Sequence, residues 1–174
     1  MTSKVFIWGL SVLTMSACSS NDTSSNAGAG GGASAPVLTA ASADTKVLWG
    51  DISGYAKWGQ FPQSTELTLS KTHNNMFVVS YINAVVTKAV ADGTVPLPDG
   101  AIIVKENYAK KDDPMPMALT VMSKMGQDWY WAQGTPDGKV FVGPDGPLEG
   151  KNVGMCVMCH GAATNNDSVL THTF

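Results

Sequence analysis

The alternation of apolar and polar residues predicts β-strands in the second half of the chain. MFVVSYI at 76–82, AIIVKENY at 101–108 and MALTVMSKM at 117–125 are rich in β-branched, aromatic and other apolar residues. DWYWAQ precedes a TPDG turn and KVFV follows it, which predicts a β-hairpin. We therefore expect a small antiparallel sheet of about five short strands.

Between the first two predicted strands, the spacing of apolar residues predicts a helix. In NAVVTKAVADG apolar residues recur every three to four positions, with Asn83 suited to begin the helix and Gly93 to end it. A second short helix is expected within 150–163. A small sheet with a few short helices makes the predicted fold class α+β.

The first 45 residues are predicted to lie outside the folded domain. Residues 1–17 carry Lys4, an apolar run too short to span a bilayer, and small residues, which is the layout of a secretory signal. MSAC resembles a bacterial lipobox, which would make Cys18 the lipidated first residue after cleavage; the alternative is an ordinary signal peptide removed together with Cys18. Residues 18–45, rich in Ser, Gly and Ala, are predicted to be a flexible linker, and 46–174 the folded domain.

These features also predict where the protein acts and which partners it lacks. We expect a protein on the periplasmic side of a Gram-negative bacterium, attached to the membrane through lipid alone, and Ser19 after the cysteine favours the outer membrane. All eleven basic residues are lysines and the formal net charge is −3. This balance provides no basic surface for phosphate backbones, so nucleic acid is not expected as a partner.

The motif CVMCH near the C-terminus predicts covalent haem. In C-x-x-C-H, the thiols of Cys156 and Cys159 add to the two vinyl groups of one porphyrin, and His160 ligates the iron. With Cys18 lipidated, no cysteine remains for a disulfide. A thioredoxin-like site would need a βαβ pattern before the motif, and a zinc site would need more ligands than His73 and His172 provide.

The position of the motif near the C-terminus argues against two common classes of c-type cytochrome. Small electron-transfer cytochromes usually carry C-x-x-C-H early and a methionine ligand downstream, whereas no methionine follows His160 here. Cytochromes built from four helices also carry the motif at the C-terminus, but the predicted strands exclude long helices.

Six segments, in order, resemble the cytochrome P-460 family: YIN, LPDGAIIVKENY, VMSKM, DWYWAQGTPDGK, CVMCH and DSVLT. The resemblance covers about residues 48–174 and implies that Lys105 forms a further covalent bond to a meso carbon of the haem. Related cytochromes c′-beta share the fold and lack this bond. On an alternating strand Lys105 follows Ile103 at the end of an apolar run, where contact with haem would lower its pKa. The alternative is a lysine whose amine reaches solvent from the strand end.

The resemblance implies an enzyme that oxidises hydroxylamine to nitric oxide or nitrous oxide at a five-coordinate haem. A redox partner cytochrome and a homodimer are also expected. Glu149 is the nearest carboxylate before the haem cysteines and the candidate proton acceptor, with Glu106 and Asp145 as weaker candidates and a solvated loop acid as the alternative. Some members place an arginine near the open haem face; this chain has none, and His73 is the candidate polar group.

Two other functions remain open on the sequence. A cytochrome c′-beta-like protein would bind nitric oxide or carbon monoxide without turnover, under a cap formed by Phe61, Phe77 and Trp131. An electron-transfer cytochrome would require a sixth ligand from the protein.

Overall fold

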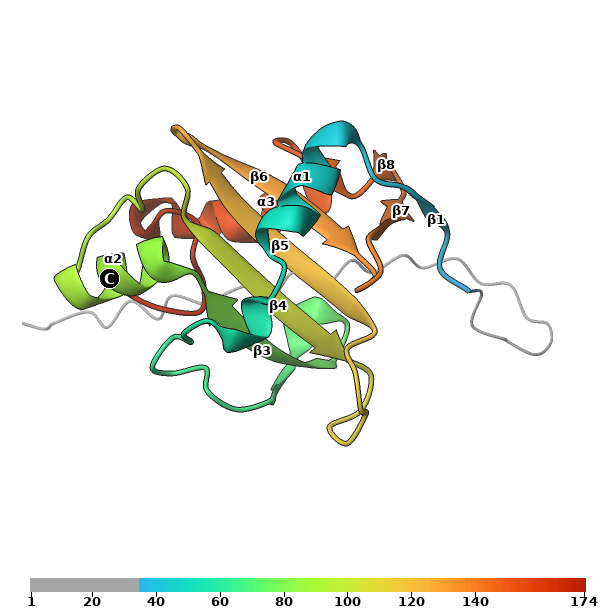
Figure 1. Cartoon of the computed structure of the whole chain (residues 1–174), viewed down its shortest axis with the longest axis horizontal. Helices are drawn as coiled ribbons and strands as arrows, with labels where there is room; N and C mark the ends of the chain where they lie inside the picture. The colour runs from blue at the N-terminus through green and yellow to red at the C-terminus, as the bar shows by residue number, and fades with distance from the viewer. Residues whose placement is uncertain (1–34) are drawn as a thin grey trace, which may run out of the picture. The chain divides into compact units, whose positions relative to one another are not determined.

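The computed structural model describes residues 35–174, which form one antiparallel sheet with helices on both faces (Figure 1). The strand order is β1-β7-β6-β5-β4-β3-β2, with β8 added to β7 and β9 to β6. The strands are β1 (Leu38–Ala40), β2 (Thr68–Ser70), β3 (Met76–Ile82), β4 (Ile102–Tyr108), β5 (Ala118–Met125), β6 (Asp128–Gly134), β7 (Lys139–Gly143), β8 (Gly146–Pro147) and β9 (Glu149–Gly150). The helices are α1 (Ala43–Asp51), α2 (Ala84–Asp92) and α3 (Gly154–His160), with single-turn or short 3-10 helices η1 (Tyr55–Lys57), η2 (Lys71–His73) and η3 (Gly161–Asn166).

The predicted α+β class is confirmed, but the expectation of about five strands is too low. The sheet has nine strands. The five predicted strands correspond to β3 to β7, whereas β1, β2, β8 and β9 are only two or three residues long. Strands this short leave no alternation to detect, and they exist because longer neighbours offer them hydrogen bonds.

The first described elements lie before the predicted start of the folded domain. β1 and the first residues of α1 lie within the predicted linker, since β1 pairs with β7 and the amide of Val142 donates to the carbonyl of Val37. Ser42 caps α1 through its side chain. The predicted signal peptide (1–17), Cys18 and most of the linker lie outside the described residues. Within residues 35–174, none of the helices combines the length and apolar character that crossing a membrane requires.

The sheet has two apolar faces because its central strands alternate. On one face Ile82, Ile103, Met122 and Trp131 are cross-strand neighbours, and they belong to the core that includes residues of α2 and the C-terminal segment. On the other face Val104, Val121 and Ala132 pack with α1. In Figure 1, α1 crosses the near side of the sheet. We call the first of these the cofactor face, for reasons given below, and the second the α1 face.

Candidate functional site

The short helix α3 presents the haem-attachment motif beside the cofactor face of the sheet. Cys156, Cys159 and His160 occupy positions i, i+3 and i+4, which places them on one side of the helix. Cys156 is partly buried, and burial raises the pKa of its thiol to about 11. At neutral pH this sulfur is therefore protonated.

His160 is held in the orientation that an iron ligand needs. Its ring is only 9 % exposed, and Trp131 contacts it edge-on with ring centroids 4.7 Å apart. Nδ1 lies 2.7 Å from the carbonyl oxygen of Ser168, so Nδ1 carries the proton and Nε2 keeps its lone pair. Burial lowers the pKa of the imidazole, which favours the neutral form that metals bind.

His160 shares a cavity with Lys105, although 55 positions separate them (160 − 105). His73 lines the same cavity from η2. The structure thus brings together three residues that the sequence singled out: the predicted iron ligand, the predicted cross-linking lysine and the candidate polar group. The remaining lining residues come from β4, β5 and the C-terminal segment: Ile103, Thr120, Met122, Val169, Leu170 and Thr171.

Lys105 points toward the cofactor face and not away from the sheet to solvent. It lies directly across from Ser80 on β3 and Thr120 on β5. Burial lowers the pKa of its ammonium group to about 8. Within residues 35–174 no carboxylate forms an ion pair with this amine. Its neighbour Ser80 has a buried hydroxyl for which the described residues provide no hydrogen-bond partner.

His73 is a further polar residue of the cavity lining, and it comes from η2. Its Nδ1 lies 3.4 Å from the hydroxyl of Ser70. Burial, and then the proximity of Lys105 and His160, lower the pKa of His73 to about 4. His73 is therefore neutral at pH 7.

The candidate carboxylates lie elsewhere. Glu149, on β9, accepts hydrogen bonds from the amide and hydroxyl of Ser42 at the start of α1, at 3.0–3.2 Å. Asp145 is on the surface turn between β7 and β8. Glu106 points to the α1 face, where three tyrosine hydroxyls donate to it, from Tyr55, Tyr81 and Tyr108. Among the described residues, those that line the cavity include no carboxylate.

Of the three aromatics proposed as a gas-binding cap, Phe61 and Trp131 belong to the core on the cofactor face, whereas Phe77 lies on the α1 face. Trp131 contacts His160, and Phe61 is fully buried and stacks on His172 with centroids 5.3 Å apart. Phe77 is the cross-strand neighbour of Tyr108, which places it with Glu106 on the α1 face.

Sequence reasoning missed several lining residues. Thr120 and Met122 were detectable, because the alternation of β5 puts them on the same face as Lys105. Val169, Leu170 and Thr171 belong to the DSVLT segment of the family resemblance, but no periodicity of the sequence places them at the cavity. They enter the cavity because Asp167 and Ser168 adopt left-handed backbone angles, φ 48° and 63°, which turn the chain after η3.

The residues present fit a covalently attached haem. α3 supplies two cysteines at the attachment spacing and a neutral imidazole with Nε2 available. Apolar side chains that a porphyrin can contact are exposed on or near this helix, namely Met155, Val157, Met158 and Leu170. On the cofactor face, the Lys105 amine has no carboxylate partner and the Ser80 hydroxyl has no hydrogen-bond partner among the described residues.

Comparison with known proteins gives one match. The family model described as Cytochrome P460 matches residues 52–171, which is most of the described chain. No curated protein and no solved structure matches.

Proposed function

Since this chain belongs to the cytochrome P460 family, whose cofactor is haem c, we propose that it oxidises hydroxylamine at a haem attached through Cys156 and Cys159. His160 would ligate the iron through Nε2, leaving the opposite face open for hydroxylamine. Lys105 would bond to a meso carbon of the porphyrin in a two-electron oxidation that breaks one N–H and one C–H bond and needs an oxidant such as hydrogen peroxide. The product would be nitric oxide or nitrous oxide, and a redox partner cytochrome would accept the electrons.

The observation that carries this proposal is the shared cavity of Lys105 and His160. A lysine at the end of a strand is ordinarily exposed, with its amine in water. Here Lys105 is partly buried and has no carboxylate partner within residues 35–174, and its lowered pKa makes the neutral, nucleophilic form accessible near neutral pH. This is the environment that bond formation to a porphyrin carbon requires.

When bound, haem supplies the electron acceptor for substrate oxidation. The protein contributes the axial ligand, an enclosure of apolar residues and a proton acceptor. His73 is better placed for the last role than Glu149, because it lines the cavity, whereas Glu149 is engaged at the start of α1. We propose His73 as the group that takes a proton from hydroxylamine.

One observation favours a second function, the reversible binding of nitric oxide or carbon monoxide. The cavity lining is mainly apolar, with Ile103, Met122, Val169 and Leu170, and includes no carboxylate among the described residues. Such a lining suits a neutral diatomic gas. The presence of Lys105 at the cavity nevertheless favours the enzyme.

Export, lipid attachment at Cys18, a location on the periplasmic face of the outer membrane and a homodimer are further parts of the proposal. They derive from the sequence pattern and from the resemblance stated above.

The proposal is tested by intact mass, optical spectroscopy and hydroxylamine-dependent reduction of an electron acceptor, for wild type and Lys105→Leu. We expect the wild-type mass to equal the chain plus haem less two hydrogens, because a nitrogen–carbon bond replaces one N–H and one C–H. The mass of Lys105→Leu should equal that of its chain plus haem, without the loss of two hydrogens. This variant should also have the spectrum of ordinary haem c and should not oxidise hydroxylamine.

Lys88→Leu is the matched control, since Lys88 is an exposed lysine on α2 whose ion pair within residues 35–174 is with Asp92. It should behave as wild type. If wild type and Lys105→Leu have the same spectrum and neither oxidises hydroxylamine, gas binding is the better assignment. A low-spin, six-coordinate spectrum would instead indicate electron transfer and contradict both.

A further inference from the structure

A buried ion pair lies next to the turn that contacts the predicted iron ligand. Nζ of Lys124, on β5, is 2.6 Å from Oδ1 of Asp167, which directly follows η3. The two side chains are only 3 % and 11 % exposed. The remaining three ion pairs among the described residues are on the surface, so this is the buried one of the set.

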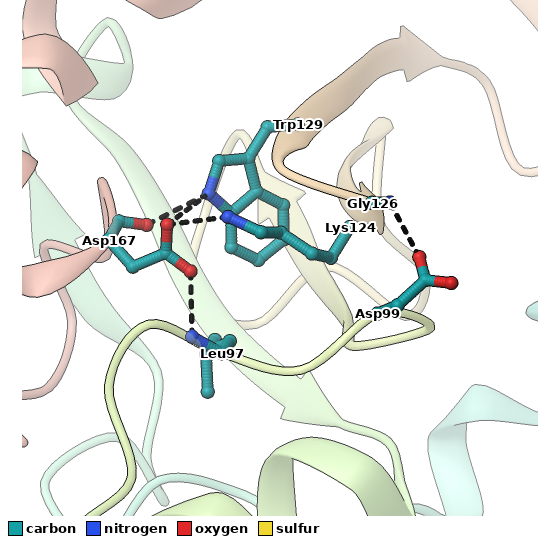
Figure 2. Close-up of polar contacts among 6 residues, drawn as sticks. All are labelled: Leu97, Asp99, Lys124, Gly126, Trp129 and Asp167. Carbon is teal, nitrogen blue, oxygen red and sulfur yellow. Dashed lines mark hydrogen bonds and ion pairs between the residues drawn. The ribbon is translucent and has the colours of Figure 1, made fainter.

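Asp167 is held from three separate parts of the chain (Figure 2). The amide of Leu97 donates to Oδ2 at 2.8 Å, and Lys124 binds Oδ1. The indole N–H of Trp129, on β6, donates to the backbone carbonyl of Asp167 at 2.9 Å and approaches Oδ1 at 3.3 Å. The Lys124 ammonium lies 5.0 Å from the centre of the Trp129 ring, a cation–π contact that fixes the lysine as well.

The residue after Asp167 contacts the predicted iron ligand directly. The carbonyl oxygen of Ser168 accepts the hydrogen bond from Nδ1 of His160 at 2.7 Å. Both Asp167 and Ser168 have positive φ, a conformation that residues with a side chain rarely adopt unless surrounding contacts enforce it. The contacts that enforce it here are those of the Asp167 carboxylate and carbonyl.

The position of the Ser168 carbonyl matters chemically. A hydrogen bond from Nδ1–H of a metal-bound histidine fixes the tautomer and the ring orientation, and makes the ligating nitrogen more basic. A more basic ligand stabilises ferric over ferrous iron. A group that holds Ser168 at hydrogen-bonding distance from His160 therefore influences the reduction potential of the iron.

We propose that Lys124 and Asp167 are positioning residues for the iron ligand, acting through the Ser168 carbonyl on His160. The inference rests on the haem-binding part of the proposed function and is independent of hydroxylamine oxidation. A purely stabilising role accounts for the pair less well, because desolvation of two charges cancels most of the attraction between them. Apolar residues would fill the same space at no such cost. What the charged pair adds is one defined position for the 167–168 turn.

The test is the iron–histidine stretching frequency of the ferrous haem protein, measured by resonance Raman spectroscopy, together with the reduction potential. In Asp167→Asn, loss of the charge releases the turn and lengthens the hydrogen bond from His160 to Ser168. We expect the frequency to fall and the preference for ferric iron to weaken about tenfold. That change corresponds to an upward shift in potential of about 59 mV.

Two controls separate this effect from others. Asp128→Asn breaks the exposed ion pair with Lys151 and should change neither value. Leu48→Ala destabilises the core on the α1 face without contact to His160, and should lower the unfolding temperature while leaving the frequency unchanged.

If Asp167→Asn does not accumulate as haem protein, the double variant Lys124→Met/Asp167→Asn, which leaves no unpaired charge, is measured instead. Unchanged frequency and potential in whichever variant folds would overturn the inference. Failure of both variants to hold haem would show a folding role and overturn it too. Absence of an iron–histidine band in a haem-loaded wild type would contradict the open, five-coordinate iron of the proposed function, whereas a band that does not change on substitution would contradict this inference alone.

Discussion

Lys105 shows how burial changes the chemistry of a single residue. With an ordinary pKa near 10.5, fewer than about one lysine in a thousand is neutral at pH 7, whereas a pKa of about 8 makes roughly one in ten neutral. The cause is desolvation, because β4 places the amine on the cofactor face between Ser80 and Thr120. Only the neutral form has a lone pair for bond formation.

The rate of cross-linking should therefore follow the ionisation of Lys105. We expect the rate, started by adding a two-electron oxidant such as hydrogen peroxide to protein with haem attached, to rise about tenfold per pH unit below pH 8 and to level off above it. Intact mass at timed intervals measures the loss of two hydrogens. Lys105→Arg is the control, since arginine stays protonated and should not react. A rate that is constant from pH 6 to pH 9 would contradict this role for the neutral amine.

The sequence predicted individual site residues where a local rule governs them. Spacing alone identifies Cys156, Cys159 and His160, and strand alternation gives the direction of Lys105. It could not predict the Ser168 carbonyl as the partner of His160, because that contact depends on a left-handed turn. The polar side chain that secures this turn bonds to groups 43 and 70 positions away.

At the scale of elements, the start of α1 explains what Glu149 does in the fold. Ser42 caps α1 by accepting from the amide of Thr45, and the Glu149 carboxylate accepts from the amide and hydroxyl of Ser42. An anion at the first turn also interacts favourably with the helix dipole. Glu149 therefore connects β9 to α1.

Substitution of Glu149 should affect stability and leave the haem unchanged. We expect Glu149→Gln to lower the free energy of unfolding by about 0.5 kcal/mol and Ser42→Ala by about 1 kcal/mol. Denaturant unfolding measures both values, and the optical spectrum and hydroxylamine oxidation rate should match wild type. Loss of turnover in Glu149→Gln with normal stability would instead identify this carboxylate as the proton acceptor.

Elements with their own sequence signals were predictable, and elements that depend on neighbours were not. α2 matches the prediction because Asn83 accepts from the amide of Val86 and Gly93 adopts the left-handed conformation that ends a helix. β3 matches because seven consecutive residues favour a strand. α1 buries only Thr45 and Leu48, too few positions for a period, and its sequence follows directly on a linker-like segment.

At the scale of the whole molecule, the sheet separates two polar groups that neighbour each other in the chain. Lys105 lies on the cofactor face, and Glu106 lies on the α1 face with the hydroxyls of Tyr55 and Tyr108 at 2.7 and 2.8 Å and that of Tyr81 at 3.3 Å. These tyrosines come from η1, β3 and β4, so one carboxylate joins elements across the α1 face. Burial, together with hydrogen bonding and the negative charge of Glu106, raises the pKa of each tyrosine.

This cluster makes the stability of the whole protein sensitive to alkaline pH. In the unfolded chain the tyrosines lose protons near pH 10, whereas in the folded protein they keep them to higher pH. The folded state then binds more protons than the unfolded state, so the free energy of unfolding falls as the pH rises above about 10. Each tyrosine whose pKa is higher in the folded than in the unfolded state lowers the free energy of unfolding by up to about 1.4 kcal/mol per pH unit.

Denaturant unfolding from pH 8 to pH 11 measures this loss, and comparison with Tyr55→Phe isolates the tyrosine contribution. Lysines also titrate in this pH range. Lys105 changes the free energy of unfolding in the direction opposite to the tyrosines, because folding lowers its pKa. These lysine contributions are the same in wild type and Tyr55→Phe, so they cancel in the comparison. We expect Tyr55→Phe to be less stable than wild type at pH 8, since Glu106 loses a donor, and to lose stability less steeply above pH 10. Parallel curves for the two proteins would show that Tyr55 ionises alike in the folded and unfolded states, and would contradict a protonated cluster around Glu106.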